Sequence, residues 1–94
     1  MFDLATATPE QFDALIGTRF AVNDSADVLE LVEVLRLRSP SSRPQAFSLF
    51  FTSRTHQLTQ ATFKLTHPKL GEMDIFLVPI QPDARGPLYE AVFN

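Results

Sequence analysis

The predicted fold of this 94-residue chain centres on one stretch, Leu70-Gly71-Glu72-Met73-Asp74-Ile75-Phe76-Leu77-Val78-Pro79-Ile80. In its first half Glu72 and Asp74 alternate with Met73 and Ile75, which is typical of a strand with one face in water. From Ile75 to Ile80 every residue is apolar, so this half is predicted to have no face in water. We therefore expect a strand that begins at the rim of a sheet and runs into the middle of a core.

The residues before this stretch are predicted to form a hairpin with it. Ala61 to Thr66 alternates apolar with polar residues, and His67 to Gly71 has turn chemistry, with Pro68 suited to the first turn position and Gly71 to positive φ. The register that matches apolar with apolar and cation with anion gives three pairs. They are Phe63 with Ile75, Leu65 with Met73 and Lys64 with Asp74.

Four further segments have the pattern of strands: Arg19 to Val22, Val28 to Arg38, Ala46 to Arg54 and Leu88 to Phe93. The alternation of the second segment fails between Leu31 and Val34, which predicts a bulge. A helix over the same segment is the alternative. The segments Ser39 to Pro44 and Gln81 to Pro87 are predicted to be loops.

A short helix is predicted near the N-terminus. Thr8 and Gln11 can form a capping box around Pro9, and Gly17 suits the left-handed C-terminal position. Phe12, Leu15 and Ile16 share one face. We expect this face to close one end of the core, with Phe12 and Ile16 in contact with a core built from Phe63, Ile75, Leu77, Tyr89, Ala91 and Phe93.

Composition predicts one soluble domain over residues 1–94. The chain has no cysteine, which excludes disulfides and zinc sites built on thiolates. The longest apolar run has six residues, Ile75 to Ile80, against the ~20 that a membrane helix needs. No signal peptide is visible, so we expect a cytoplasmic protein or one released in an assembly, without contact to a membrane.

No residue set predicts catalysis, a metal site or a cofactor site. The two histidines, His56 and His67, lie in a segment that has no nearby carboxylate in sequence. The three glycines are spread along the chain and form no phosphate-binding loop. Glu72 and Asp74 share a strand face, which is better explained by solvation or cross-strand pairing than by acid–base catalysis. We therefore expect no enzymatic activity.

Charge is distributed unevenly along the chain, whose net charge is −3. No acid lies between Val34 and Gly71, where six basic residues lie, and all eleven acids lie outside. A basic patch with exposed aromatic residues would suit nucleic acid. Here the phenylalanines alternate as core residues and the chain is acidic overall, so we do not expect nucleic-acid binding.

The candidate interface lies on the strand from Ala46 to Arg54. Alternation buries Phe47 and Phe51 but leaves Phe50 on the opposite face. One explanation is that the helix or a loop covers Phe50. The other is a contact surface for a partner protein or a second copy, centred on Phe50 with Arg36, Arg38 and Arg54 at its rim.

The sequence also resembles a family of short bacterial proteins that have no assigned activity. The resemblance covers nearly the whole chain and is carried by a Phe12-to-Gly17 helix motif and by several segments of the second half. These are Phe47-Ser48-Leu49, Phe63-Lys64-Leu65-Thr66-His67-Pro68-Lys69-Leu70-Gly71, Ile75-Phe76-Leu77-Val78-Pro79-Ile80 and Tyr89-Glu90-Ala91-Val92-Phe93-Asn94. It implies an accessory or assembly role beside phage-tail-like or tail-collar fibre proteins, and it transfers no catalytic residues.

Together these patterns predict a mainly β fold, a small antiparallel barrel or sandwich of about six strands with one short N-terminal helix over an opening. The expected function is a non-enzymatic binding or assembly module without cofactors. The alternative is a small ligand-binding barrel, or an enzyme whose site is assembled from scattered polar residues. A pocket with converging polar groups would favour the alternative, and an apolar patch or free strand edge would favour the module.

Overall fold

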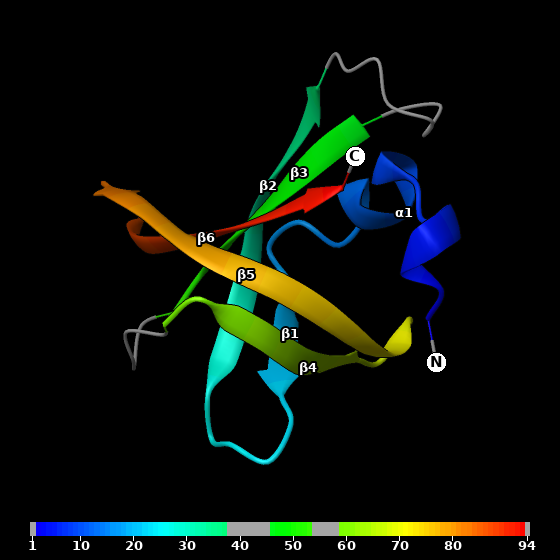
Figure 1. Cartoon of the computed structure of the whole chain (residues 1–94), viewed down its shortest axis with the longest axis horizontal. Coiled ribbons are helices and arrows are strands. Elements are labelled where there is room, and N and C mark those ends of the chain that lie inside the picture. The colour runs from blue at the N-terminus through cyan, green and yellow to red at the C-terminus, as the bar shows by residue number, and fades with distance from the viewer. Residues whose placement is uncertain (1, 38–45, 54–58, 94) are drawn as a thin grey trace.

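The computed structural model describes residues 2–37, 46–53 and 59–93, and within them six antiparallel strands close into a barrel (Figure 1). The order around the barrel is β1-β2-β3-β6-β5-β4. This confirms the predicted fold class and selects the barrel over the sandwich. The strands are β1 (Arg19–Val22), β2 (Val28–Leu37), β3 (Ala46–Thr52), β4 (Ala61–His67), β5 (Gly71–Asp83) and β6 (Gly86–Phe93).

The hairpin of β4 and β5 has the register that side-chain matching predicts. Phe63 lies opposite Ile75, Leu65 opposite Met73 and Lys64 opposite Asp74. Gly71 has a φ of 84°, as the turn requires. The bulge predicted in β2 is also confirmed, because the register between β2 and β3 shifts between Leu31 and Glu33.

The core fills the barrel interior with inward-facing residues from every strand. Of the predicted core residues, Ile75, Leu77, Tyr89, Ala91 and Phe93 are buried, and Phe63 is half-buried against them. The same core cluster also includes Phe20, Leu29, Leu31, Leu49 and Leu65. Because a barrel has one interior, each strand contributes one face to this core, although β3 is largely buried on both faces.

A short helix, α1 (Pro9–Asp13), covers one end of the barrel. The Gln11 Oε1 atom accepts a hydrogen bond of 2.8 Å from the Thr8 backbone N–H, which is the Gln11 half of the predicted capping box. The Phe12 ring is fully buried and lies 6.1 Å from the ring of Phe47 and 6.2 Å from that of Phe93. These contacts close the core at the end near both chain termini (Figure 1).

The prediction that Ile16 helps to close the core is wrong. Ile16 is 46% exposed, and Leu15 is buried instead. The helix ends at Asp13, so the chain no longer follows a helical period at Ile16. Gly17 then adopts a φ of 88°, and its backbone N–H donates a hydrogen bond of 2.7 Å to the carbonyl oxygen of Leu31.

The second half of β5 also differs from its prediction. Alternation persists as far as Leu77, with Phe76 exposed and Leu77 buried, but Pro79 is exposed although it lies opposite buried Tyr89. The reason is that α1 covers an end of the barrel and leaves the outer wall at Phe76 uncovered. Apolar residues at the outward positions of β5 therefore lie at the surface.

The segment from Gln81 to Pro87 is a tight hairpin and not the predicted loop. β5 continues to Asp83, and β6 begins at Gly86, opposite Asp83. Arg85, in the turn, donates a hydrogen bond of 2.9 Å to Glu33 Oε1 on β2 and further ones to the Asp83 carboxylate. These bonds hold the β5–β6 turn against β2.

Among the described residues, no helix is long and apolar enough to cross a membrane.

Candidate protein-binding groove

β5 and β6 separate at the end of the barrel that α1 covers. Their ladder runs from Val78 opposite Glu90 to Asp83 opposite Gly86, and among the described residues no further pair joins these strands. Figure 1 shows β5 and β6 diverging toward α1 and the chain termini. The opening is a groove of about 330 Å³, here called the β5–β6 groove, lined by Leu4, Asp74, Ile75, Phe76, Val78, Glu90, Ala91, Val92 and Phe93.

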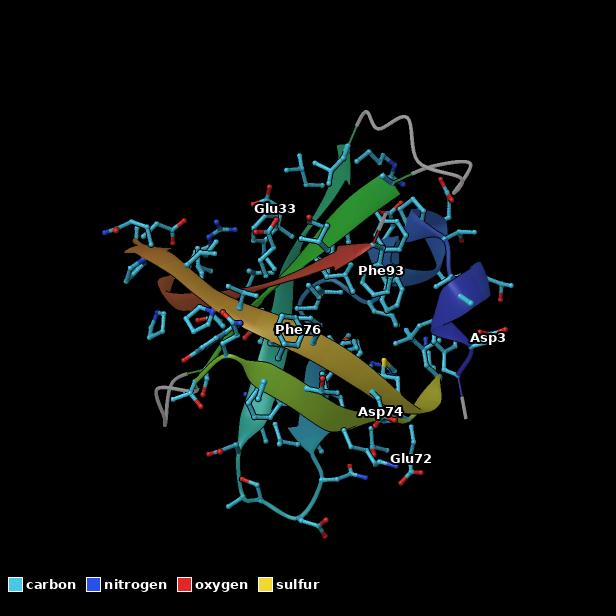
Figure 2. The ribbon with its side chains drawn as sticks, viewed as in Figure 1. Asp3, Glu33, Glu72, Asp74, Phe76 and Phe93 are labelled. Carbon is cyan, nitrogen blue, oxygen red and sulfur yellow. The ribbon has the colours of Figure 1, made fainter. Side chains whose placement is uncertain are left out.

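The groove has a core-like floor and exposed apolar walls. Ile75, Ala91 and Phe93 belong to the barrel core and line the groove from inside. Phe76 on β5 and Val92 on β6 are each 51% exposed. Figure 2 shows Phe76 over the front of β5 and Phe93 nearer to α1. A ligand in the groove would therefore contact apolar side chains on its floor and on both walls.

The edge of β5 that faces the groove has backbone groups outside the ladder. The carbonyl oxygen of Glu72 accepts a hydrogen bond of 2.8 Å from the backbone N–H of Phe2, on the side of β5 away from β4. Backbone groups of an antiparallel strand alternate in direction, so those of Asp74 and Phe76 point to that same side. The backbone groups of Asp74 and Phe76 lie between Glu72, which is bonded to Phe2, and Val78, where pairing with β6 begins.

The apolar wall of the groove continues around the outside of the barrel. Val92 lies opposite Ser48 of β3, which in turn lies opposite Leu35 of β2, and Leu35 is 42% exposed. Half-buried Phe50 and Val78 flank the same Glu90 in the next row. We call these five apolar residues the outer band: Leu35, Phe50, Phe76, Val78 and Val92.

The predicted interface residues are placed differently from one another. Phe50 is half-buried on the outer face of β3 and belongs to the outer band. Arg36 lies opposite Phe47, which points into the barrel, so Arg36 is on the opposite sheet face from Phe50. Arg38 and Arg54 lie outside the described residues.

Arg36 on β2 is hydrogen-bonded to acidic residues of α1. Its Nη1 atom donates a hydrogen bond of 3.1 Å to Asp13 Oδ1, and its Nη2 lies 3.4 Å from Glu10 Oε2. The hydrogen bond from Arg36 holds the pKa of the Asp13 carboxyl below its usual value. Arg36 is thus part of the contact that closes the barrel end, and we leave it out of the outer band.

Carboxylates give the groove a negative rim. Asp74 and Glu90 line it, and Figure 2 shows Glu72 beside Asp74 at the end of β5 nearest Asp3. Glu90 Oε2 accepts a hydrogen bond of 2.8 Å from the Ser48 hydroxyl. The Nζ atom of Lys64 lies 3.9 Å from Asp74 Oδ1, with both side chains about half exposed, so water screens this pair strongly.

His67 has a structural environment that satisfies both ring nitrogens. Nδ1 accepts a hydrogen bond of 3.0 Å from the Lys69 backbone N–H, so the ring proton is on Nε2, 3.0 Å from Thr18 Oγ1. Thr18 in turn donates to the carbonyl oxygen of Leu15. Burial lowers the pKa of His67, and the charge of Lys69 lowers it further. This neutral ring, packed on Phe20, fixes the β4–β5 turn to the start of β1.

The part of the chain that the structure describes offers no cluster of metal-ligating side chains. Within residues 2–37, 46–53 and 59–93, no group of three or more histidine, aspartate or glutamate side chains could hold a metal ion. The arrangement that the structure offers for recognition is the groove, with its apolar walls, acidic rim and strand edge. That combination suits a segment of polypeptide.

Sequence reasoning missed Phe76 and Val92 as surface residues. Both lie in or next to apolar runs, and such runs are expected inside a sheet covered on both faces. A signal was present all the same. A chain with one short helix has little to cover the outer wall of a barrel, so an apolar run on both faces of a strand implies surface apolar residues.

Comparison with known proteins places the chain in a family. No curated protein and no solved structure matches it. A family model described as a domain of unknown function (DUF6916) matches residues 7–93, which span all six strands and α1. The chain therefore belongs to the DUF6916 family.

Proposed function

We propose that this chain is a non-enzymatic binding module that holds a segment of a partner protein in the β5–β6 groove and on the outer band. The observation that carries the proposal is the exposed apolar wall made by Phe76 and Val92. Among the described residues five large apolar side chains are exposed, and Leu35, Phe76 and Val92 of these belong to the outer band. Such clustering at a groove marks contact sites more often than scattered apolar exposure does.

The partner protein is favoured over a small substrate by the chemistry of the groove. Enzyme and small-molecule sites combine an apolar lining with several converging polar groups. Here the polar side chains of the lining are the two carboxylates Asp74 and Glu90, and both stand at the rim. The alternative of a ligand-binding barrel predicts specific small-molecule binding that the Phe76→Thr variant loses.

The proposed setting is an assembly, in which the module acts as an accessory subunit. The support for this is the sequence resemblance to proteins that accompany phage-tail-like or tail-collar fibre proteins. A short barrel with an apolar groove suits a role in joining parts rather than in turnover. Self-association is the second form of the same proposal, in which the partner segment belongs to another copy.

Site-specific photo-crosslinking in the native host tests the proposal. A photo-reactive residue in place of Val92 is expected to link one partner reproducibly, and the same residue in place of Val28 is expected to link none. Val28 is a matched control because it is 41% exposed but lies on β2 outside the groove lining. Phe76→Thr should abolish the link from position 92. Equal linkage from both positions, or linkage unaffected by Phe76→Thr, would contradict the proposal.

A further inference from the structure

We infer that the segment bound in the groove is an extended strand in which lysine or arginine alternates with small apolar residues, paired to the open edge of β5. This inference rests on the proposed function and names the class of its ligand. It follows from three features of the same groove: the backbone edge, the acidic rim and the apolar floor.

The backbone edge sets the conformation of the bound segment. The N–H and C=O groups of Asp74 and Phe76 face the groove between two places where this edge is already paired, at Glu72 and at Val78. The chain's own Phe2 shows that a backbone group can bond to this edge. An extended segment of about four residues, roughly 13 Å long, would span the open part.

The acidic rim sets the charge of the segment. Residues of an added strand that lie opposite Asp74 and Phe76 have side chains on the same outer face. Asp74 and Glu90 line this face, and Glu72 follows outward along β5. Lys64, at 3.9 Å from Asp74, is the one cation paired with these three carboxylates among the described residues. A basic side chain on the added strand would complement them, and its aliphatic stem would cover Phe76.

The groove floor determines which side chains fit at the inward-pointing positions of the bound segment. Side chains of the added strand that point the other way meet Ile75, Ala91 and Phe93, all less than one-tenth exposed. Only apolar side chains avoid burying a polar group there without a partner. The groove of about 330 Å³ leaves space for small residues such as valine or alanine. The resulting pattern is basic outside and small apolar inside.

A capped heptapeptide of alternating lysine and valine is the probe, titrated into the isotope-labelled protein and followed by NMR. Binding is expected to shift the backbone amides of Asp74, Phe76 and Val92 and to slow hydrogen exchange at the first two. Two peptides serve as controls. One replaces each lysine with glutamate, and the other keeps the sequence but has N-methylated central residues that cannot pair with an edge.

Four variants locate the contacts. Phe76→Thr is expected to weaken binding about tenfold, the scale of a central aromatic contact. Asp74→Asn is expected to weaken it about threefold, the scale of an exposed ion pair. Val28→Thr and Glu30→Gln change exposed or half-exposed side chains of β2 away from the groove, and neither should alter the affinity. Circular dichroism of each variant verifies that the fold is retained.

Several results would overturn the inference. They are equal binding of the glutamate peptide, equal binding of the N-methylated peptide, shifts confined to residues outside the groove, and no binding of the lysine–valine peptide at millimolar concentration. If the peptide fails while position 92 still crosslinks a partner in a Phe76-dependent manner, the ligand class is wrong and the proposed function stands. If both fail, both are wrong.

Discussion

Replacing Leu77 by alanine should destabilise the barrel strongly. Leu77 is fully buried near the middle of β5, opposite Ala61 of β4. Truncation to alanine removes three carbon atoms, worth about 2.4 kcal/mol at ~0.8 kcal/mol each. β5 is paired with β4 at Leu77 and with β6 from Val78 onward, so the strands around this site cannot collapse fully and a cavity penalty adds to the loss. We expect a total loss of about 2–5 kcal/mol in the free energy of unfolding.

Equilibrium unfolding in urea, followed by circular dichroism and by tyrosine fluorescence, measures this loss. A small domain has a stability of about 5–15 kcal/mol, so the variant should lose a large share of it. Leu35→Ala is the matched control, because it makes the same chemical change at a side chain that is 42% exposed. It should cost less than about 1 kcal/mol. Equal losses for the two variants would mean that β5 does not run through the core as described.

Three further predictions concern pH and association. His67 has a lowered pKa in the folded protein, so below about pH 6.5 the unfolded chain takes up a proton that the folded chain resists. The free energy of unfolding should therefore decrease as the pH is lowered through this range. In His67→Gln, urea unfolding at a series of pH values should no longer show this decrease. The Asp13 carboxyl should titrate below its usual range by NMR and return toward it in Arg36→Gln, whereas an unchanged midpoint would mean that the bond to α1 does not persist in solution. Phe50→Ser should weaken partner or self-association in light scattering and crosslinking while circular dichroism stays unchanged; unaltered association would remove Phe50 from the outer band.

Alternation along the sequence was sufficient to predict most of the strands and the hairpin register. Lys64 with Asp74 and Phe63 with Ile75 match in chemistry only in one register, and a slip by one residue would turn every side chain to the wrong face. The bulge in β2 was also predicted, because the alternation of apolar and polar residues fails at that point in the sequence. The alternation of apolar and polar residues does not show which strands are neighbours, so the sequence predicted a barrel and a sandwich equally well. The strand order β1-β2-β3-β6-β5-β4 decides between them.

The binding groove was only half predictable, for a physical reason. Phe50 was found because it breaks an alternating pattern, whereas Phe76 and Val92 sit in apolar runs that conceal the difference between inside and outside. Arg36 was expected at the rim of the Phe50 surface, but the pairing of Arg36 with Phe47 places it on the other face of the sheet. Side-chain direction after the bulge depends on the strand pairing, which a single sequence does not contain.

The acidic rim has a consequence for how such a groove can exist on a protein in solution. Closing a barrel removes free strand edges, and the β5–β6 divergence reopens one beside exposed Phe76. An uncharged edge of this kind would pair with the same edge of another copy. Asp74 and Glu72, both on this stretch of β5, oppose that pairing, because two copies would bring like charges together. The same carboxylates attract a basic segment. In the proposed function, one pair of side chains thus both discourages edge-to-edge association and selects the ligand. Replacing Asp74 and Glu72 by lysine should reverse the charge of the preferred segment and still oppose edge-to-edge pairing, whereas Asp74→Asn combined with Glu72→Gln should weaken both properties.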